Sequence, residues 1–390
     1  FSGYKPCVHS IQNSEVQCSS HCAFRDPVET RILLIHLGAL GAVLRSTSLL
    51  QAIKRKYPKS HLTWVTDRPA DALLLGLKQV DRVVTSSDRD LLGIKGLKFD
   101  VVFNVDKSMI SSGIVKLVNA AQVFGFLVDE KTHAIVPATP AANELWQLGL
   151  SNEKKFFENK KSEAQLVHEA LDLGEFHRDS YQVNLSCAEI SLAETRRFDW
   201  MQNKDLVIGL NVGCSPTIPN KKLSISNHRS LIAKLALKFP NASFVLLGGP
   251  EDTKRCFEIA SGMDVFISPT QGGLRDGLTS VSACDVVITG DSLGMHMAIA
   301  LKKWTVAWFG PTCEQEIDLF DRGIKVLTKA GCAPCWKRVC DQQSMCYDQV
   351  DLAEIIEGVE LGFRKIGTTD NSLHSDGIHR GSSIGYAYAE

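Results

Sequence analysis

The sequence lacks an excess of charge of either sign. Its 43 basic and 44 acidic side chains leave a formal net charge of -1, so no overall field attracts nucleic acid or an anionic membrane surface. It also lacks an apolar run long enough to cross a bilayer as a helix. The first residues are polar and do not form a secretory signal. We therefore expect a cytoplasmic protein that binds no nucleic acid and has no transmembrane segment.

Cysteine, in contrast, is abundant. The chain has 12 cysteines, several of them clustered, and clustering without a secretory signal favours metal ligands or reduced thiols over a disulfide scaffold. A late cluster of four is spaced closely enough to hold structural zinc or iron, including an Fe–S cluster. Reduced thiols or two disulfides are its alternatives. An early cluster of three has an irregular spacing, which suits either a metal site or free thiols on a loosely attached extension. The clusters are Cys7, Cys18 and Cys22, and Cys332, Cys335, Cys340 and Cys346.

Strand and helix patterns alternate along most of the chain. Short apolar strands and helical patterns follow one another from residue 31, and the cycle restarts near residue 205. This alternation predicts an α/β chain of two doubly wound, Rossmann-like domains with a ligand-binding cleft between them. We expect a cysteine-bearing arm at 1–30, domains at 31–200 and 201–365, and a disordered tail at 366–390 with little to bury. The helical patterns cover 42–57, 69–77, 91–97, 114–121, 162–170, 226–239, 251–260 and 277–283, and the charged run 193–203 is expected to lead into a connector.

The most informative single segment runs from Val286 to Leu301. It predicts a short buried strand, a polar turn at Thr289–Ser292, and a helix capped by Ser292 or Asp291. A helix that begins directly after a strand leaves its first N–H groups facing outward, and these attract an anion. Asp291 and His296 stand beside that position. From these residues alone, an ordinary capped helix after a strand is the simpler interpretation.

A glycine-bearing turn or loop follows the first strand of each half. Gly38 and Gly41 let the backbone approach a ligand at the carboxyl end of a strand, where doubly wound sheets bind. Their spacing is less specific than the dinucleotide fingerprint, and no acidic residue stands at the ribose-reading position. Dinucleotide binding is therefore disfavoured. The corresponding loop of the second half carries Gly213 and the lysines Lys221 and Lys222.

Several of these segments together resemble glycosyltransferase family 9, the ADP-heptose heptosyltransferases. The resemblance covers about residues 31–362. It implies a GT-B architecture, in which two Rossmann-like domains face each other across a cleft, with the acceptor mainly on the first and the nucleotide-sugar mainly on the second. It also implies inversion at the anomeric carbon and no metal requirement for the transfer. The segments are Arg31–Gly41, Leu44–Thr47, Gly290–His296, Phe309–Thr312 and the cysteine-rich Cys332–Cys340.

The resemblance also implies a donor site built around the late strand–helix turn. Departure of a diphosphate builds negative charge, which a lysine and a helix N-terminus must carry where no metal takes part. The structural alternatives are a capping Asp, a solvated Lys and a His at the edge of the core. The implied residues are Asp291, Ser292 and Gly294 in the turn, His296 at the phosphates or sugar, Lys221 (or Lys222) at the leaving diphosphate, Gly213 in the loop before them, and Glu251 near the ribose.

One position departs from the family pattern. The family turn usually reads Gly-Asp-Val-Leu, and its Asp is the proposed general base, whereas this chain has Ala42 there. An engineered Asp-to-Ala change, a different base or lost activity would each account for it. An inverting transferase needs a carboxylate or imidazole near the attacking oxygen. Asp106, at the end of another strand of the first domain, is the best alternative base, unless it only forms a turn.

The function that we expect is an inverting, metal-independent transfer of heptose from ADP-heptose to an acceptor hydroxyl. The acceptor could be a lipopolysaccharide core sugar, a protein Ser or a small natural product, with peripheral membrane contact if it is lipid-linked. No cofactor is expected for catalysis, and zinc or iron at the cysteines would be structural. The alternatives are a nucleotide-sugar epimerase or hydrolase of similar architecture, or a catalytically silent protein that binds a sugar nucleotide.

Overall fold

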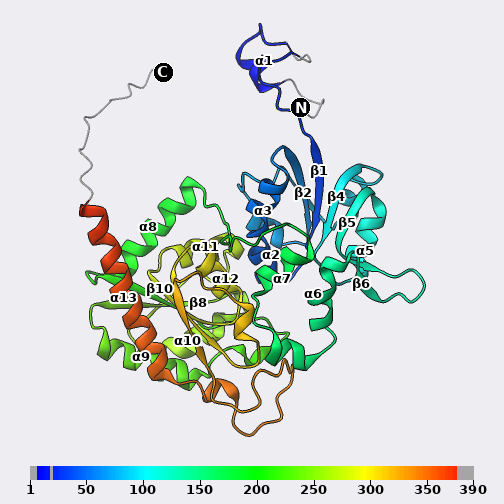
Figure 1. Ribbon diagram of the computed structural model, residues 1–390. Coiled ribbons are helices and arrows are strands. Elements are labelled where there is room, and N and C mark those ends of the chain that lie inside the picture. Colours follow the sequence, from blue (N-terminus) through cyan, green and yellow to red (C-terminus); the bar gives the residue numbers. More distant parts are fainter. Residues whose placement is uncertain (1–6, 18–20, 376–390) are drawn as a thin grey trace. The chain divides into compact units, whose positions relative to one another are not determined.

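Two six-stranded sheets organise the chain, one in each of two compact units (Figure 1). The computed structural model describes residues 7–17 and 21–375. The first unit comprises the residues up to Ala39 together with Ser48–Leu150 and Gln165–Asp179. The second comprises Leu40–Thr47, Ser151–Ala164 and the residues from Ser180 onward. The predicted α/β class is confirmed, but the two units interleave in sequence instead of meeting once near residue 200.

The first sheet has the strand order β3-β2-β1-β4-β5-β6. Its strands are parallel except β6, which is antiparallel to β5, and β1, β2, β4 and β5 lie side by side in blue and cyan (Figure 1). Ile32–Ile35 of β1 are fully buried, as expected for a strand covered on both faces. The chain winds from β1 outward and returns to β4, so the topological switch point lies between β1 and β4. The strands are β1 (Thr30–Ile35), β2 (Ser60–Thr66), β3 (Arg82–Thr85), β4 (Lys98–Asn104), β5 (Asn119–Val128) and β6 (Ile135–Pro137).

The second sheet has the order β12-β11-β10-β7-β8-β9 and is parallel throughout. The chain winds from β7 to β9 on one side and from β10 to β12 on the other. The switch point therefore lies between β7 and β10, where a doubly wound sheet binds its ligand. The strands are β7 (Leu206–Asn211), β8 (Ala242–Leu247), β9 (Phe266–Ile267), β10 (Val286–Gly290), β11 (Trp304–Phe309) and β12 (Gly323–Leu327).

Helices connect the strands of both sheets. Helix α12 packs against β10, β11, α2 and α11, and it is buried from Met295 to Ala300. A helix covered on all sides has no solvent-facing polar stripe, so α12 is not amphipathic. No helix among the described residues is long and apolar enough to cross a membrane. The helices are α1 (Val8–Gln12), α2 (Leu40–Ser46), α3 (Leu49–Lys56), α4 (Asp88–Leu92), α5 (Met109–Leu117), α6 (Asn143–Leu148), α7 (Glu163–Ala170), α8 (Cys187–Met201), α9 (Ile225–Lys238), α10 (Thr253–Ala260), α11 (Gly273–Ser282), α12 (Leu293–Ala300) and α13 (Leu352–Ser375).

The helix predicted over 42–57 is in fact two helices, α2 and α3. Thr47 stands at the break, and its hydroxyl donates to the carbonyl of Leu44 at 2.6 Å and accepts from the N–H of Gln182 at 2.7 Å. A side chain that bonds to the backbone in this way competes with the helical hydrogen bonds. The break falls where the chain passes from the second unit back to the first.

The end of the described chain also differs from the prediction. Residues 366–375, expected to begin a disordered tail, continue helix α13 to Ser375. This helix lies beside α9 and packs on β11 and β12 (Figure 1), and Gly358 admits the side chain of Ile324 where a Cβ would clash. Residues 376–390 lie outside the described part of the chain.

Candidate functional site

The carboxyl ends of β7 and β10 meet at the switch point of the second sheet, and Asn211 joins them. Its amide donates to the carbonyl of Gly213 at 2.9 Å, to Ser292 Oγ at 2.9 Å and to Thr289 Oγ1 at 3.2 Å. Gly294 makes room for it, because a Cβ there would lie 2.7 Å from Asn211 Oδ1. One side chain thus fixes the loop after β7 against the turn after β10. The sequence analysis did not single out Asn211.

The start of α12 lies in this turn. Ser292 is the N-cap residue, but its side chain makes no capping hydrogen bond; its hydroxyl instead meets Asn211 and Thr289. Ser292, one of the two predicted capping residues, therefore occupies the N-cap position without its side chain capping the helix. Without that cap, the N–H groups of Leu293 and Gly294 at the positive end of the helix are left to a ligand, and an anion is the ligand that such a terminus favours.

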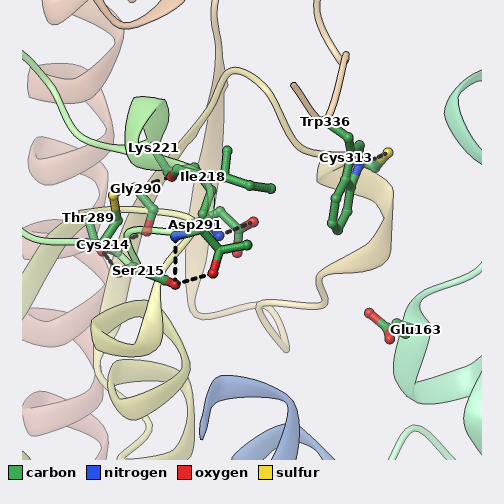
Figure 2. Close-up of polar contacts among 12 residues, drawn as sticks. Glu163, Cys214, Ser215, Ile218, Lys221, Thr289, Gly290, Asp291, Cys313 and Trp336 are labelled. Carbon is green, nitrogen blue, oxygen red and sulfur yellow. Dashed lines mark hydrogen bonds and ion pairs between the residues drawn. The ribbon is translucent and has the colours of Figure 1, made fainter. Parts of the chain in front are cut away.

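Lys221 and Asp291 form an ion pair beside this helix start. Lys221 Nζ lies 3.5 Å from Asp291 Oδ2, and each side chain is 15% exposed (Figure 2). Burial opposes the charge of Asp291, yet the Lys221 ammonium nearby holds its pKa below the ordinary value. Gly290 is needed here because a Cβ would clash with the backbone carbonyl of Lys221. The structure thus brings together Lys221, Asp291 and the α12 N-terminus, as the sequence predicted.

The neighbouring lysine has a different environment. Burial raises the pKa of Asp252, and the positive charge of Lys222 opposes this rise. Asp252 accepts from the N–H of Gly249 at 3.1 Å and fills the space beside Gly213, where a Cβ would clash with its carboxylate. Glu251, the predicted ribose reader, is exposed in the adjacent turn. Gly213 therefore admits Asp252, a residue that the sequence analysis did not single out.

Arg255 holds both ends of the loop that carries the two lysines. Its Nε donates to the carbonyl of Val212 at 3.0 Å, and its Nη2 donates to the carbonyl of Leu223. Arg255 lies on α10, far from the loop in sequence, so no local pattern indicated this contact. It fixes the loop from which Lys221 reaches Asp291.

His296 lies one turn into α12 and packs against α2 of the same unit. Gly41 admits its ring, because a Cβ at Gly41 would clash with His296 Cδ2. Burial first, and then the positive charge of Arg45, lower the pKa of His296 to about 3, so the imidazole is neutral at physiological pH. Gly41 thus serves a contact between two helices. Gly38, in the first unit, is exposed with open space where its Cβ would be, and the half-buried Ala42 follows Gly41 in α2.

Gly41→Ala is expected to destabilise the protein by about 1–3 kcal/mol, because the added methyl displaces the buried His296 ring. Gly113→Ala is the matched control, since Gly113 is also helical but has open space around its Cβ. That change should stabilise the protein by a few tenths to about 1 kcal/mol. Denaturant unfolding measures both, and equal effects of the two substitutions would contradict the Gly41–His296 contact.

A cluster of charged side chains continues from His296 within the second unit. Arg45 of α2 is buried and lies 2.7 Å from Glu163, and the charges of Glu316 and Asp291 also act on it. Lys155 pairs with Glu316. Sequence spacing could not reveal this cluster, because its members come from segments more than a hundred residues apart.

Trp336 is attached to the same cluster. Its Nε1 donates to Cys313 Sγ at 3.4 Å (Figure 2), and Lys155 Nζ lies 4.6 Å from the centroid of its ring. The charges of Glu316, Lys155 and Asp291 all act on the Cys313 thiol, whose pKa burial raises to about 11. The loop that carries the late cysteines is thereby tied to the site through Trp336.

In the first unit, Asp106 lies at the other switch point, after β4 and beside the end of β1. Its Oδ2 accepts from the N–H of Leu37, and its Oδ1 lies 3.7 Å from His36 Nε2. Burial raises the pKa of Asp106 to about 7, with a further contribution from Asp67. A carboxylate with such a pKa can take up a proton near neutral pH. Asp106 is therefore placed and tuned as more than a turn-forming residue.

Among the described residues, the cysteines show neither a metal-binding arrangement nor disulfides. Among residues 7–17 and 21–375, no group of three or more His, Cys, Asp or Glu side chains is arranged to hold a metal ion, and each described cysteine is free. The late cysteines do lie near one another: burial, followed by the charges of the other three, raises the pKa of Cys346 to about 11. Their arrangement does not fit a tetrathiolate site, however. Of the early cluster, Cys7 and Cys22 are half-buried, and Cys18 lies outside the described residues.

Comparison with known proteins gives similarity to heptosyltransferases both from a family model and from an individual relative. A family model described as glycosyltransferase family 9 (heptosyltransferase) matches residues 93–346. Lipopolysaccharide heptosyltransferase 1 of Campylobacter coli is 22% identical over 348 residues, which are 85% of this chain and 98% of that protein.

Two solved structures show the same fold. A glycosyltransferase family 9 structure from Veillonella parvula has a TM-score of 0.69 at 18% identity, covering 87% of this chain and 99% of that one. The ADP-heptose lipopolysaccharide heptosyltransferase II of E. coli has a TM-score of 0.60 at 15% identity, covering 86% and 99%. The predicted pair of Rossmann-like, parallel-sheet domains of the GT-B class is confirmed.

Proposed function

The chain belongs to glycosyltransferase family 9, the heptosyltransferases, and we propose that it transfers heptose from ADP-heptose to an acceptor hydroxyl with inversion. The observation that carries this proposal is the Lys221–Asp291 pair beside the uncapped start of α12. These groups stand at the switch point of a doubly wound sheet, where such folds bind nucleotides.

The donor end of the reaction needs groups that stabilise a leaving diphosphate. As the bond between the anomeric carbon and the phosphate oxygen breaks, negative charge grows on ADP. The Lys221 ammonium and the N–H groups of Leu293 and Gly294 are suited to receive it, since preorganised donors in a site with little water stabilise developing charge strongly. Asn211 holds the turn that presents them. With these groups, the transfer itself requires no metal.

The acceptor end needs a base. In an inverting transfer, the acceptor oxygen attacks the anomeric carbon on the face opposite to ADP and must lose its proton. We assign the base role to Asp106, because Ala42 offers no carboxylate and the pKa of about 7 at Asp106 suits proton uptake at neutral pH. The oxygen–carbon bond forms, the carbon–phosphate oxygen bond breaks, and the proton passes to the Asp106 carboxylate.

A catalytically silent protein is the second candidate, and the observation in its favour is Ala42 at the position of the usual base. An epimerase or a hydrolase of similar architecture would also use a bound sugar nucleotide. We propose a cytoplasmic reaction, on a lipopolysaccharide core sugar, a protein Ser or a small molecule. A lipid-linked acceptor would add peripheral contact with a membrane.

Mass spectrometry of the products distinguishes these functions. Each reaction contains the protein, ADP-heptose and one class of acceptor. The expected result is an acceptor heavier by one heptose with an equal amount of ADP. Free heptose without a modified acceptor would indicate a hydrolase, and an isomeric ADP-sugar an epimerase. Tight donor binding without any product would indicate a silent protein.

A further inference from the structure

Tyr181 presents a buried hydroxyl group without a partner inside the second unit. The residue is 2% exposed, and its Oη has no hydrogen-bond partner among the described residues. Native proteins rarely leave a buried hydroxyl unpaired, because its lost contacts with water are not replaced. The ring is fixed in place: its centroid lies 5.5 Å from that of Phe320, edge to face, and 5.9 Å from that of His296. The hydroxyl is therefore held ready for a group that is not part of the protein.

A second unpaired atom lies on the neighbouring ring of His296. His296 Nδ1 is buried and also has no partner in the described chain, and the close contact with Gly41 fixes the imidazole ring. The imidazole is neutral, since burial lowers its pKa to about 3. Burial also raises the pKa of Tyr181 above its usual value, so the phenol keeps its proton. Two rigid, uncharged groups that can donate or accept hydrogen bonds thus stand close together.

The charges around these two groups indicate what they bind. Arg45, Glu163, Asp318 and Asp291 all act on the Tyr181 phenol, so carboxylates outnumber cations there. A phosphate would be repelled by these carboxylates, and it has the Lys221 ammonium and the α12 N-terminus available instead. Sugar hydroxyl groups, in contrast, pair well with carboxylates and with neutral donors and acceptors.

We propose that Tyr181 is a specificity-determining residue that hydrogen-bonds a hydroxyl group of the donor's sugar, with His296 Nδ1 as the neighbouring contact. The proposal rests on the proposed function, because the sugar concerned is the heptose of ADP-heptose. It divides the site into two parts: the Lys221 side binds the diphosphate, and the Tyr181 side recognises the sugar. The buried phenol then gains the partner that it lacks in the protein alone.

Tyr181→Phe tests this assignment, because it removes only the unpaired oxygen. Calorimetric titration with ADP-heptose and with ADP separates the contribution of the sugar from that of the nucleotide. The expected result is an affinity about tenfold lower for ADP-heptose, as for the loss of one buried hydrogen bond, with unchanged affinity for ADP. Tyr57→Phe removes a phenol oxygen in the first unit and should change neither affinity. An equal loss for both ligands, or no loss for either, would overturn the assignment.

Donor analogues that lack one sugar hydroxyl at a time provide a readout that a structural role of Tyr181 would not affect. The wild-type protein should bind one of these analogues about tenfold more weakly than ADP-heptose, and Tyr181→Phe should bind that analogue no more weakly than ADP-heptose. Equal discrimination by both proteins would overturn the role of Tyr181 and leave heptose transfer intact. If the wild-type protein binds ADP but gains no affinity from the heptose, the inference and the proposed function both fail.

Discussion

Replacing Lys221 by Met is expected to lower kcat for heptose transfer by about 10²–10³, the range found when one preorganised oxyanion-stabilising group is removed. The ammonium lies 3.5 Å from Asp291 Oδ2 at the start of α12, where we propose that the diphosphate leaves. Its charge is worth more in the transition state than in the bound donor, because negative charge grows on ADP as the bond breaks. The main loss should therefore appear in kcat, with a smaller effect on KM for ADP-heptose.

Lys222→Met is the matched control for this prediction. The two lysines are adjacent in sequence, but Lys222 acts on Asp252, whereas Lys221 forms the ion pair with Asp291. We expect Lys222→Met to change kcat by less than about tenfold. Lys221→Met also leaves Asp291 without its ion-pair partner, so circular dichroism and thermal unfolding must show that the variant is folded. Comparable losses of kcat in two folded variants would contradict the role of Lys221.

The fold was largely predictable because its signals are local. Runs such as Ile32–Ile35 and Val286–Ile288 are fully apolar, which is typical of parallel strands buried on both faces. One failure occurred where a distant contact overrides the local pattern. The hydroxyl of Thr47 breaks a continuous helical pattern, because it bonds to Leu44 and also to Gln182, 135 residues away. Helix α8 was missed although Ser186 and Glu189 form a capping box, a signal that is visible in the sequence.

The site was predictable only in part. Lys221 and Asp291 stand in a loop and a turn, and His296 in the helix that follows; their positions follow from the strand order, so sequence reasoning could bring them together. Asn211 and Arg255 act through contacts to segments far along the chain, and no spacing rule encodes such contacts. For the late cysteines, the suitable spacing in sequence is not matched by a metal-binding arrangement among the described residues, and metal binding there stays a prediction.

Asp106→Asn is expected to lower kcat/KM for transfer by about 10²–10⁴, the usual contribution of a general base. Because the base must be deprotonated, wild-type kcat/KM should rise with pH and level off above about 7, the pKa of Asp106. Ala42→Asp is the control, since it restores a carboxylate at the position of the family's usual base. If Asp106 is the base, this change should not raise transfer strongly. A large gain from Ala42→Asp together with unchanged activity in Asp106→Asn would assign the base to position 42.

Asp106→Asn should raise the stability of the protein while it lowers the activity. These opposite effects separate a role in catalysis from a role in folding. The pKa of Asp106 rises from an ordinary 3.8 to about 7 in the folded protein. Between these values the folded state binds more protons at Asp106 than the unfolded state, so the contribution of Asp106 to stability is greatest at low pH and is lost as pH rises through about 7. Asn cannot ionise and still accepts a hydrogen bond from Leu37. The stability of Asp106→Asn should therefore match that of the wild type near pH 4 and exceed it above pH 7, by about 4 kcal/mol at most.

Urea unfolding at pH 5 and pH 8 measures this difference in stability. A variant that is less active yet more stable at pH 8 would show that the buried carboxylate is retained for the reaction and not for the fold.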